Sequence, residues 1–285
     1  MVLYLIDDKI IKKIIGSVAQ KPRTIQEVAQ LLRVNWRTAD RYVQLIAKER
    51  GTLATRVFRE GTRGALKVVY CQTDEKINST EFQERLFQRI LLGRKKEDFS
   101  PLDIYQYVDE KKRRAFLETQ KEEFATIEQD VISLLMSATK QVFIFSGNLS
   151  WATVKQGKQS VRGVLLAVAK RGIPIKILTR IDIASEKNLL LVNEINEELG
   201  RTAIEIRHCE QPLRAIVIDS TQARLKELKA IKHYKSGELE KNTFIFYDLF
   251  DPDWNEWLVK VFWHLFQTAV PAKKRIDIIS SLKKL

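Results

Sequence analysis

The chain has 285 residues, of which 45% are hydrophobic and 30% are charged, and its formal net charge is +13. A chain of this length has room for two domains. We expect a globular protein, because no apolar run reaches the roughly 18 residues that a membrane-spanning helix needs. Two cysteines, Cys71 and Cys209, are too few for a disulfide framework or a zinc cluster. The N-terminus has no signal-peptide pattern, which predicts a cytoplasmic location.

The positive charge is unevenly distributed along the chain. Residues 1–73 contain 14 lysines and arginines against 6 acidic residues, a net charge of +8, whereas residues 74–140 carry −2 and residues 141–285 carry +7. A basic segment alone is usually a solvated surface. The same charge on a DNA-binding motif would instead favour a nucleic acid as partner, so the pattern of residues 1–73 decides between the two interpretations.

Residues 7–19 form the first predicted helix, with isoleucines and a valine on one side. A second helix begins at Thr24, because Thr24 and Glu27 have the spacing of a capping box, in which each side chain bonds the backbone N–H of the other residue. Val28 and Leu32 are among its inward positions. The two helices supply part of a small three-helix core.

Asn35 is placed to cap a third helix. The periodicity predicts that this helix turns four residues inward, namely Trp36, Ala39, Val43 and Ile46. The opposite face carries the polar residues Arg37, Thr38, Arg41, Gln44 and Lys48. Arg33 occupies a turn position where many helix-turn-helix proteins have glycine.

Residues 53–58 and 65–70 read as the two strands of a hairpin, whose connection carries Arg59 and Arg63 near its tip. Three helices followed by such a hairpin predict a winged helix-turn-helix. Arg37 and Arg41 then suit guanine, Gln44 and Asn35 suit adenine or phosphate, and Lys48, Arg59 and Arg63 suit phosphates. The predicted DNA-binding residues are Asn35, Arg37, Thr38, Arg41, Gln44, Lys48, Arg59 and Arg63.

Residues 74–140 are expected to form a helical connector between two domains. Residues 73–80 are polar, residues 81–92 have helical periodicity, and the helical pattern is nearly unbroken from 101 to 140. The apolar positions of the later part are Phe116, Phe124, Ile127, Val131, Leu134 and Leu135. This stripe either packs against its own domain or forms a dimerising helix pair.

From residue 141 the pattern changes to strands that alternate with helices, which predicts an α/β sheet covered on both faces. The expected strands are 141–146, 173–178, 203–207, 215–218 and 243–247, and the expected helices are 160–171, 184–199 and 253–269. The fold class is therefore a multidomain α/β protein, with domains at 1–73, 74–140 and 141–285.

The last segment resembles a phospholipase D-like half-domain. Enzymes of that family carry His-x-Lys-x-x-x-x-Asp on a strand, and the matching stretch here runs from Pro212 to Asp219. Arg214 stands at the lysine position and Asp219 at the aspartate position, but Pro212 replaces the nucleophilic histidine. Because proline has no nucleophilic side chain, we predict that the site is not catalytic.

The three histidines offer no better nucleophile. His233 and Glu240 have the motif's spacing, but the residues between them are polar, as in an exposed loop. His208 is out of register, and His264 lies among aromatic residues, as a packed helix position does. The sequence shows no metal-ligand cluster and no glycine-rich phosphate loop, so we predict no catalytic residue, metal or cofactor.

A candidate ligand pocket is expected at the carboxyl end of the first strand of the α/β region, where open α/β sheets usually bind ligands. Asn148 and Trp151 follow that strand. Arg214 and Asp219 either keep an anion or small-molecule pocket or form an ion pair with each other.

This layout resembles the TrmB-like archaeal transcriptional regulators. The C-terminal stretches that carry the resemblance are 142–147, 173–178 and 212–219. The resemblance implies binding of double-stranded DNA, a homodimer formed through the central helices, a small-molecule effector and a cytoplasmic, nucleoid-associated protein. Three alternatives remain open: a chromatin-like architectural protein, a phosphodiesterase or nuclease of the phospholipase D superfamily, and a protein-interaction module.

Overall fold

The computed structural model has a mixed α/β architecture that divides into two units. Unit 1 comprises Met1–Phe82 and Leu228–Thr243, and unit 2 comprises Gln83–Glu227 and Phe244–Leu285. The structure describes residues 6–50, 53–59, 65–71, 79–119, 131–156, 159–234, 239 and 241–282. None of the described helices combines the length and the apolar character that crossing a membrane requires.

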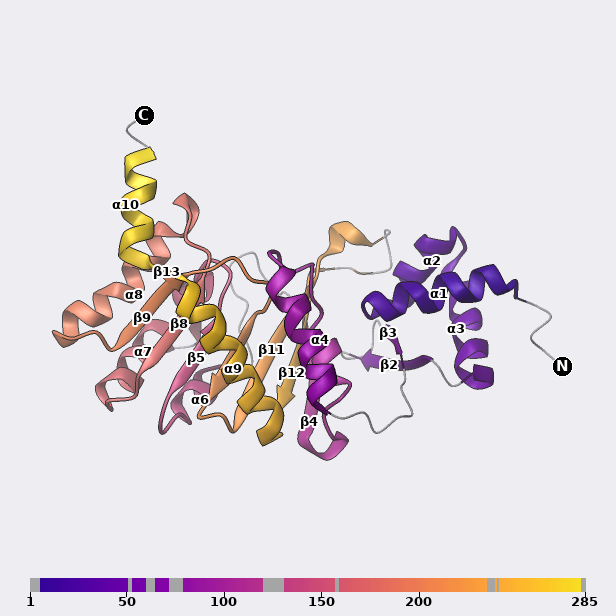
Figure 1. Ribbon diagram of the computed structural model, residues 1–285, viewed down its shortest axis with the longest axis horizontal. Coiled ribbons are helices and arrows are strands. Elements are labelled where there is room, and N and C mark those ends of the chain that lie inside the picture. Colours follow the sequence, from indigo (N-terminus) through magenta and orange to yellow (C-terminus); the bar gives the residue numbers. More distant parts are fainter. Residues whose placement is uncertain are drawn as a thin grey trace. The chain divides into compact units, whose positions relative to one another are not determined.

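Unit 1 contains three helices and a three-stranded antiparallel sheet of order β1-β3-β2 (Figure 1). These elements are α1 (Asp8–Gln20), β1 (Arg23–Thr24), α2 (Ile25–Leu32), α3 (Trp36–Arg50), β2 (Leu53–Arg59) and β3 (Ala65–Cys71). The predicted helices and the predicted hairpin are confirmed. Their core contains the fully buried Ile11, Ile14, Val28, Val43 and Val69.

The caps of unit 1 form as the sequence predicts. The Thr24 hydroxyl accepts from the Glu27 backbone N–H at 3.2 Å, and the Glu27 carboxylate accepts from the Thr24 N–H at 2.7 Å. Burial raises the pKa of Glu27, but Lys229, the bonds with Thr24 and Arg23 together outweigh it, so the pKa lies below its ordinary value. Glu27 is therefore charged at neutral pH, at a helix N-terminus that favours negative charge.

Unit 2 is built on an eight-stranded sheet of order β13-β9-β8-β5-β10-β11-β12-β4. β5, β8 and β9 are parallel, while β10 is antiparallel to both β5 and β11. The sheet strands are β4 (Arg113–Thr119), β5 (Val142–Phe145), β8 (Ile175–Thr179), β9 (Ile204–His208), β10 (Ala215–Ile218), β11 (Gln222–Lys229), β12 (Thr243–Leu249) and β13 (Val270–Pro271).

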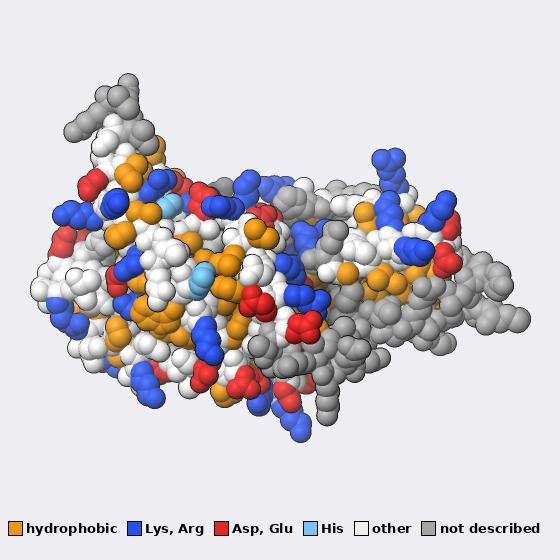
Figure 2. Space-filling view, in the orientation of Figure 1, with side chains coloured by type: hydrophobic (Ala, Val, Ile, Leu, Met, Phe, Trp, Pro, Cys, Tyr) orange, Lys and Arg blue, Asp and Glu red, His pale blue; other side chains and the backbone are white. Residues whose placement is uncertain are grey.

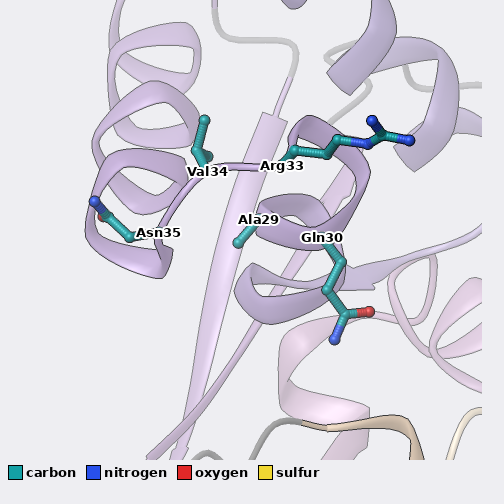
Figure 3. Close-up of a pocket in the computed structure, with 5 residues that line it drawn as sticks. All are labelled: Ala29, Gln30, Arg33, Val34 and Asn35. Atoms are coloured by element: carbon teal, nitrogen blue, oxygen red, sulfur yellow. The ribbon is translucent and has the colours of Figure 1, made fainter.

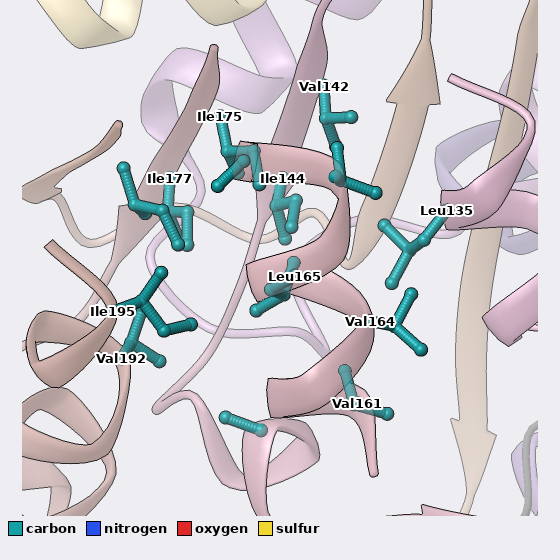
Figure 4. Packing of buried hydrophobic residues seen from close by; sticks show 14 of the residues in the cluster. Leu135, Val142, Ile144, Val161, Val164, Leu165, Ile175, Ile177, Val192 and Ile195 are labelled. Atoms are coloured by element: carbon teal, nitrogen blue, oxygen red, sulfur yellow. The ribbon is translucent and has the colours of Figure 1, made fainter. Parts of the chain in front are cut away.

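Helices cover both faces of this sheet, as predicted. On one face α7 and α8 pack against β5 and β8, with Leu165 and Val192 turned towards Ile144 and Ile177 (Figure 4). On the other face α9 crosses the strands, and its Phe262 ring lies 4.8 Å from that of Phe143. The remaining described helices are α4 (Ser79–Leu92), which spans the unit boundary at Phe82, α5 (Leu102–Tyr105), α6 (Val131–Met136), α7 (Val161–Lys170), α8 (Glu186–Leu199), α9 (Pro252–Thr268) and α10 (Ala272–Leu282).

The remaining short elements lie in the loops. A two-stranded ribbon joins β6 (Lys155–Gln156) to β7 (Gln159–Ser160). Single 3-10 turns occur at η2 (Glu110–Lys112), η3 (Ser150–Thr153), η4 (Ile183–Ser185) and η5 (Ile231–His233).

The expectation of a nearly continuous helix over residues 101–140 is wrong. Residues 113–119 form β4, the edge strand next to β12. Phe116 stacks on Phe246 of β12 at 5.2 Å, and Val131, Leu134 and Leu135 are buried in the core of unit 2. These members of the expected dimer stripe thus pack against their own unit. Phe124 and Ile127 lie outside the described residues.

Candidate nucleic-acid interface

The turn between α2 and α3 sets the direction of α3. Arg33 ends α2 in the left-handed conformation, with φ 57° and ψ 41°, and its backbone N–H donates to the carbonyls of Ala29 and Gln30. Asn35 then caps α3, because its Oδ1 accepts from the Thr38 N–H at 2.8 Å. The left-handed residue makes the turn tight enough for α3 to start three residues later, at Trp36.

A shallow hollow of about 470 Å³ lies at this turn. Its lining residues are Ala29, Gln30, Arg33, Val34 and Asn35. Gln30 and Arg33 point away from Asn35, so the polar groups lie on two sides of the turn (Figure 3).

The two faces of α3 differ as the periodicity predicts for most positions. Ala39, Val43 and Ile46 are buried in the core of unit 1. Arg37 and Arg41 lie one turn apart on the opposite side and are exposed. Asn35 and Gln44 are exposed as well, and Thr38 is half-buried. Lys48 lies in α3 and Arg59 in β2, but their side chains, and all of Arg63, fall outside the described part of the chain.

The exception is Trp36, which the periodicity places inward. Half of its surface is exposed. Trp36 is the first residue of α3, so no preceding helical turn covers its ring. The prediction that Trp36 belongs to the core is therefore wrong.

The two exposed arginines of α3 rest on aromatic neighbours. The Arg37 guanidinium lies 5.6 Å from the centre of the Trp36 ring, and the Arg41 guanidinium lies 5.8 Å from that of Tyr42. Neither arginine forms an ion pair with a carboxylate among the described residues. Their positive charge is therefore directed at solvent.

One acidic residue of the same helix, Asp40, is neutralised within unit 1. Asp40 pairs with Lys67 of β3 at 2.6 Å and accepts from the Gln44 amide at 3.0 Å. The pair ties α3 to the hairpin and removes a negative charge from the neighbourhood of Arg37 and Arg41. It also occupies the donor group of Gln44.

Unit 2 brings together a second set of predicted site residues at the carboxyl end of β5. The Ser146 hydroxyl accepts from the Trp151 indole at 2.9 Å and from the Leu149 N–H at 3.1 Å. The carbonyl of Asn148 accepts from Asn188 of α8 at 3.0 Å. Asn148 and Trp151 therefore lie where the sequence predicts, but their contacts with the protein also hold the loop after β5 in place.

Arg214 lies at the same edge, directly before β10. Its Nη1 donates to the carbonyls of Gln211 and Leu213 at 3.1 and 2.6 Å. A Cβ at Gly147 would come within 2.8 Å of Arg214 Nε, so the guanidinium requires glycine there. Burial, with the nearby Arg180, lowers the pKa of Arg214 to about 10, which leaves it protonated at neutral pH. It is a largely buried cation held by carbonyls.

Asp219 lies at the other end of β10, so the expected Arg214–Asp219 pair is wrong. Four strand residues separate the two positions, which at about 3.3 Å per residue places them roughly 16 Å apart. Asp219 accepts instead from the N–H groups of Lys140 and Gln141, both at 2.8 Å, and from Thr139. Burial raises its pKa, but these bonds outweigh it and lower the pKa overall. Asp219 is thus a cap for the start of β5.

The nucleophiles near the phospholipase D-like stretch are poorly suited to attack. His208 Nδ1 accepts from the Ile181 N–H at 2.8 Å, and burial, then Arg275, lowers the pKa of this histidine. Burial raises the pKa of the Cys209 thiol to about 11. The side chain of His233 lies outside the described residues. Among the residues that are described, no group of three His, Cys, Asp or Glu side chains could hold a metal ion.

Comparisons with known proteins give distant structural likenesses. No family model matches the chain, and no curated protein matches it by sequence. The phospholipase D family member Nuc of Salmonella typhimurium aligns over 56% of this chain and 97% of its own, at 14% identity and a TM-score of 0.41. NucT of Helicobacter pylori aligns over 56% and 99%, at 13% identity and 0.38.

A third likeness covers both units. TrmBL2, described as an archaeal chromatin protein with a novel mode of DNA binding, aligns over 94% of this chain and 95% of its own. The identity is 14% and the TM-score is 0.38. All three TM-scores lie below 0.5, and neither a family nor a function follows from these likenesses.

Proposed function

We propose that the protein binds double-stranded DNA through unit 1 and acts as a transcriptional regulator of the TrmB-like type. The observation that best supports this proposal is the exposed face of α3, which carries Arg37 and Arg41. The opposite face of the helix is buried and consists of Ala39, Val43 and Ile46. The three helices and the hairpin of unit 1 support the interpretation as a winged helix-turn-helix. In that motif the second of the two named helices enters the major groove.

The proposed contacts follow from the chemistry of each side chain. Arg37 and Arg41 present planar forks that suit the O6 and N7 atoms of guanine. Asn35 and Thr38, at the start of α3, suit phosphates or adenine. Lys48, Arg59 and Arg63 complete the proposed phosphate contacts. The charge of +8 on residues 1–73 supports the polyanion as partner.

Titration of labelled duplex DNA at several salt concentrations tests this proposal. We expect the affinity to fall steeply with salt, and Arg37→Ala and Arg41→Ala each to cost about 1–3 kcal/mol at a preferred site. Lys187→Ala, which removes an exposed cation of α8, is the control and should leave binding unchanged. Absence of duplex binding by the unmodified protein at low salt would refute the proposal.

A chromatin-like architectural protein is the second candidate. One observation favours it: the donor group of Gln44 is already bonded to Asp40, which leaves α3 with fewer groups that read bases. Selection of bound sequences from a random duplex pool separates the candidates. Enrichment of one motif supports a regulator, and even recovery of all sequences supports architecture.

We further propose that unit 2 is not catalytic. We also propose that it binds an anionic effector at the carboxyl end of β5. Arg214, Asn148 and Trp151 are the proposed lining, since Asp219 lies at the other end of its strand. Pro212 supports the absence of covalent phosphoryl chemistry. Thermal melting with and without inorganic phosphate tests the site: stabilisation of the parent protein, lost in Arg214→Met, is expected. Metal-independent hydrolysis of a phosphodiester would contradict the first part.

The dimer implied by the resemblance remains part of the proposal, as do the domain boundaries at 73 and 140. A dimer would place two α3 helices on successive half-sites of the duplex. Sedimentation of the free protein and of its DNA complex measures the stoichiometry directly.

A further inference from the structure

Trp36 is a large apolar side chain that is exposed at the start of α3, next to the exposed Arg37. It is 50% exposed, whereas the other positions that the periodicity turns inward, Ala39, Val43 and Ile46, are at most 1% exposed. An indole ring gains much free energy when it is buried. Its exposure therefore leaves a substantial apolar surface available to a partner.

The position of Trp36 on α3 specifies where that partner would lie. Trp36 and Asp40 are four residues apart and so lie on the same side of the helix. Asp40 pairs with Lys67 of β3 at 2.6 Å, which identifies this side as the one that faces the hairpin. Trp36 thus lies at the first turn of α3, between the hairpin and the exposed face that carries Arg37 and Arg41, which we call the arginine face.

The charges around the ring select the kind of partner. Arg37 lies against the ring at 5.6 Å, and Arg41 follows one turn later on the arginine face. The nearest acidic residue of the helix, Asp40, is neutralised by Lys67. An apolar ring flanked by cations is complementary to the floor of the major groove, where thymine methyl groups lie between two rows of phosphates.

From this arrangement we propose that Trp36 contacts the C5 methyl groups of thymines in the major groove and gives the protein a preference for them. The inference rests on the proposed binding of duplex DNA by α3 and names a further residue of that interface. It adds an apolar contact to the charged contacts of Arg37 and Arg41.

Replacement of thymine by uracil tests the proposal, since it removes only the methyl group. The probe is a mixed-sequence duplex of about 30 base pairs together with the same duplex in which every thymine is replaced by uracil. We expect the unmodified protein to prefer the thymine duplex about 4-fold, which corresponds to the transfer of one methyl group. Trp36→Ala should bind both duplexes equally, and Trp36→Phe should keep part of the preference.

Arg37→Ala is the matched control on the same helix. It should weaken binding of both duplexes and keep their ratio, because it removes a charged contact and leaves the ring. A second control is thermal melting of Trp36→Ala, which should change little, since the ring is half exposed.

The outcomes are distinguishable. Two results would overturn the inference about Trp36 and leave the proposed DNA binding intact. One is equal binding of the two duplexes by the unmodified protein, and the other is a thymine preference in Trp36→Ala as large as in the unmodified protein. No binding of either duplex at low salt overturns the proposed function itself.

Discussion

Arginine side chains have opposite surroundings in the two units. In unit 1, Arg37 and Arg41 are exposed and have no ion pair with a described carboxylate. In unit 2, Arg224 is 4% exposed and binds Asp248 through two bonds of 2.6 and 2.9 Å, while Arg114 bonds the same carboxylate at 2.8 Å. The contrast teaches that a buried carboxylate partner commits an arginine to the fold, whereas an exposed arginine without one keeps its charge accessible to solvent.

The surfaces agree with this division. On the face of unit 2 seen in Figure 2, basic and acidic side chains are interspersed around a group of hydrophobic ones. Many of its cations have partners, such as Lys176 with Glu205 at 2.7 Å and Arg180 with Asp182 at 3.0 Å. A surface of paired charges has a weaker field than the arginine face of α3.

The largest expected effect is on the buried ion pair. Asp248→Asn leaves Arg224 as an uncompensated buried charge, so we expect a loss of about 3–5 kcal/mol in the free energy of unfolding. Urea denaturation measures this loss. Glu197→Gln, at an exposed position of α8, is the control and should stay within about 0.5 kcal/mol. If Asp248→Asn is as stable as the control, the buried ion pair does not hold unit 2 together, and the contrast with the exposed arginines of unit 1 is lost.

Acid should act in opposite directions on Asp103 of unit 2 and on Glu27 of unit 1. In unit 2, burial raises the pKa of Asp103 to about 6 despite its ion pair with Arg89 at 2.7 Å. The folded state thus holds this proton more tightly than the unfolded state, and stability falls as pH rises from about 4 to 6, by up to about 3 kcal/mol. In unit 1, the pKa of Glu27 is lowered in the folded state. Its carboxylate therefore stabilises the fold at pH values above the unfolded pKa, and this stabilisation is lost as the pH falls.

Hydrogen exchange from about pH 3 to 7, resolved by segment, measures both directions, because the contribution of Glu27 changes below its unfolded pKa. We expect α5 to become less protected as pH rises and α2 to become more protected, after correction for intrinsic exchange. Asp103→Asn should remove the pH dependence of protection in α5 and leave that of α2. An unchanged slope in this variant would show that another group is responsible.

A charge-conserving change sharpens the contrast at α3. Arg37→Lys keeps the positive charge but loses the planar fork, so we expect a loss of about 1–3 kcal/mol at a preferred site and an unchanged salt dependence. Stability should change by less than about 0.5 kcal/mol. Competition between specific and random duplexes measures the first quantity. Equal binding of the lysine variant would place Arg37 among the phosphate contacts.

The smallest expected effect concerns the turn before α3. Arg33 has φ 57°, where a Cβ costs about 1–2 kcal/mol, so Arg33→Gly should stabilise unit 1 by about that amount. Arg33→Ala keeps the Cβ and is the matched control. Thermal melting distinguishes the two variants, and a glycine variant that melts no higher than the alanine variant would argue against strain at this turn.

The sequence predicted the elements whose signals are local. Thr24 and Glu27 mark the start of α2, and Asn35 marks the start of α3. Short, mostly apolar runs marked β5 and β8, because parallel strands buried on both faces are rich in apolar residues. The placement of Arg37 and Arg41 on the exposed face of α3 followed from the same helical period.

What depends on distant partners could not be predicted. Residues 113–119 alternate weakly, and their identity as β4 comes from their place beside β12, more than a hundred residues later. Trp36 has helical spacing to Ala39 and Val43 but lacks a preceding turn to cover it. Arg214 and Asp219 are close in the sequence, but the extended strand β10 between them holds them apart in space.

Unit 1 is discontinuous in the sequence, because Leu228–Thr243 returns to it from unit 2. The peptide chain therefore passes from one unit to the other three times. A fragment cut after Phe82 would lack one of the two segments of unit 1, and removing the unit intact would mean cutting the chain at all three crossings. The two units therefore cannot be separated by a single cleavage of the backbone.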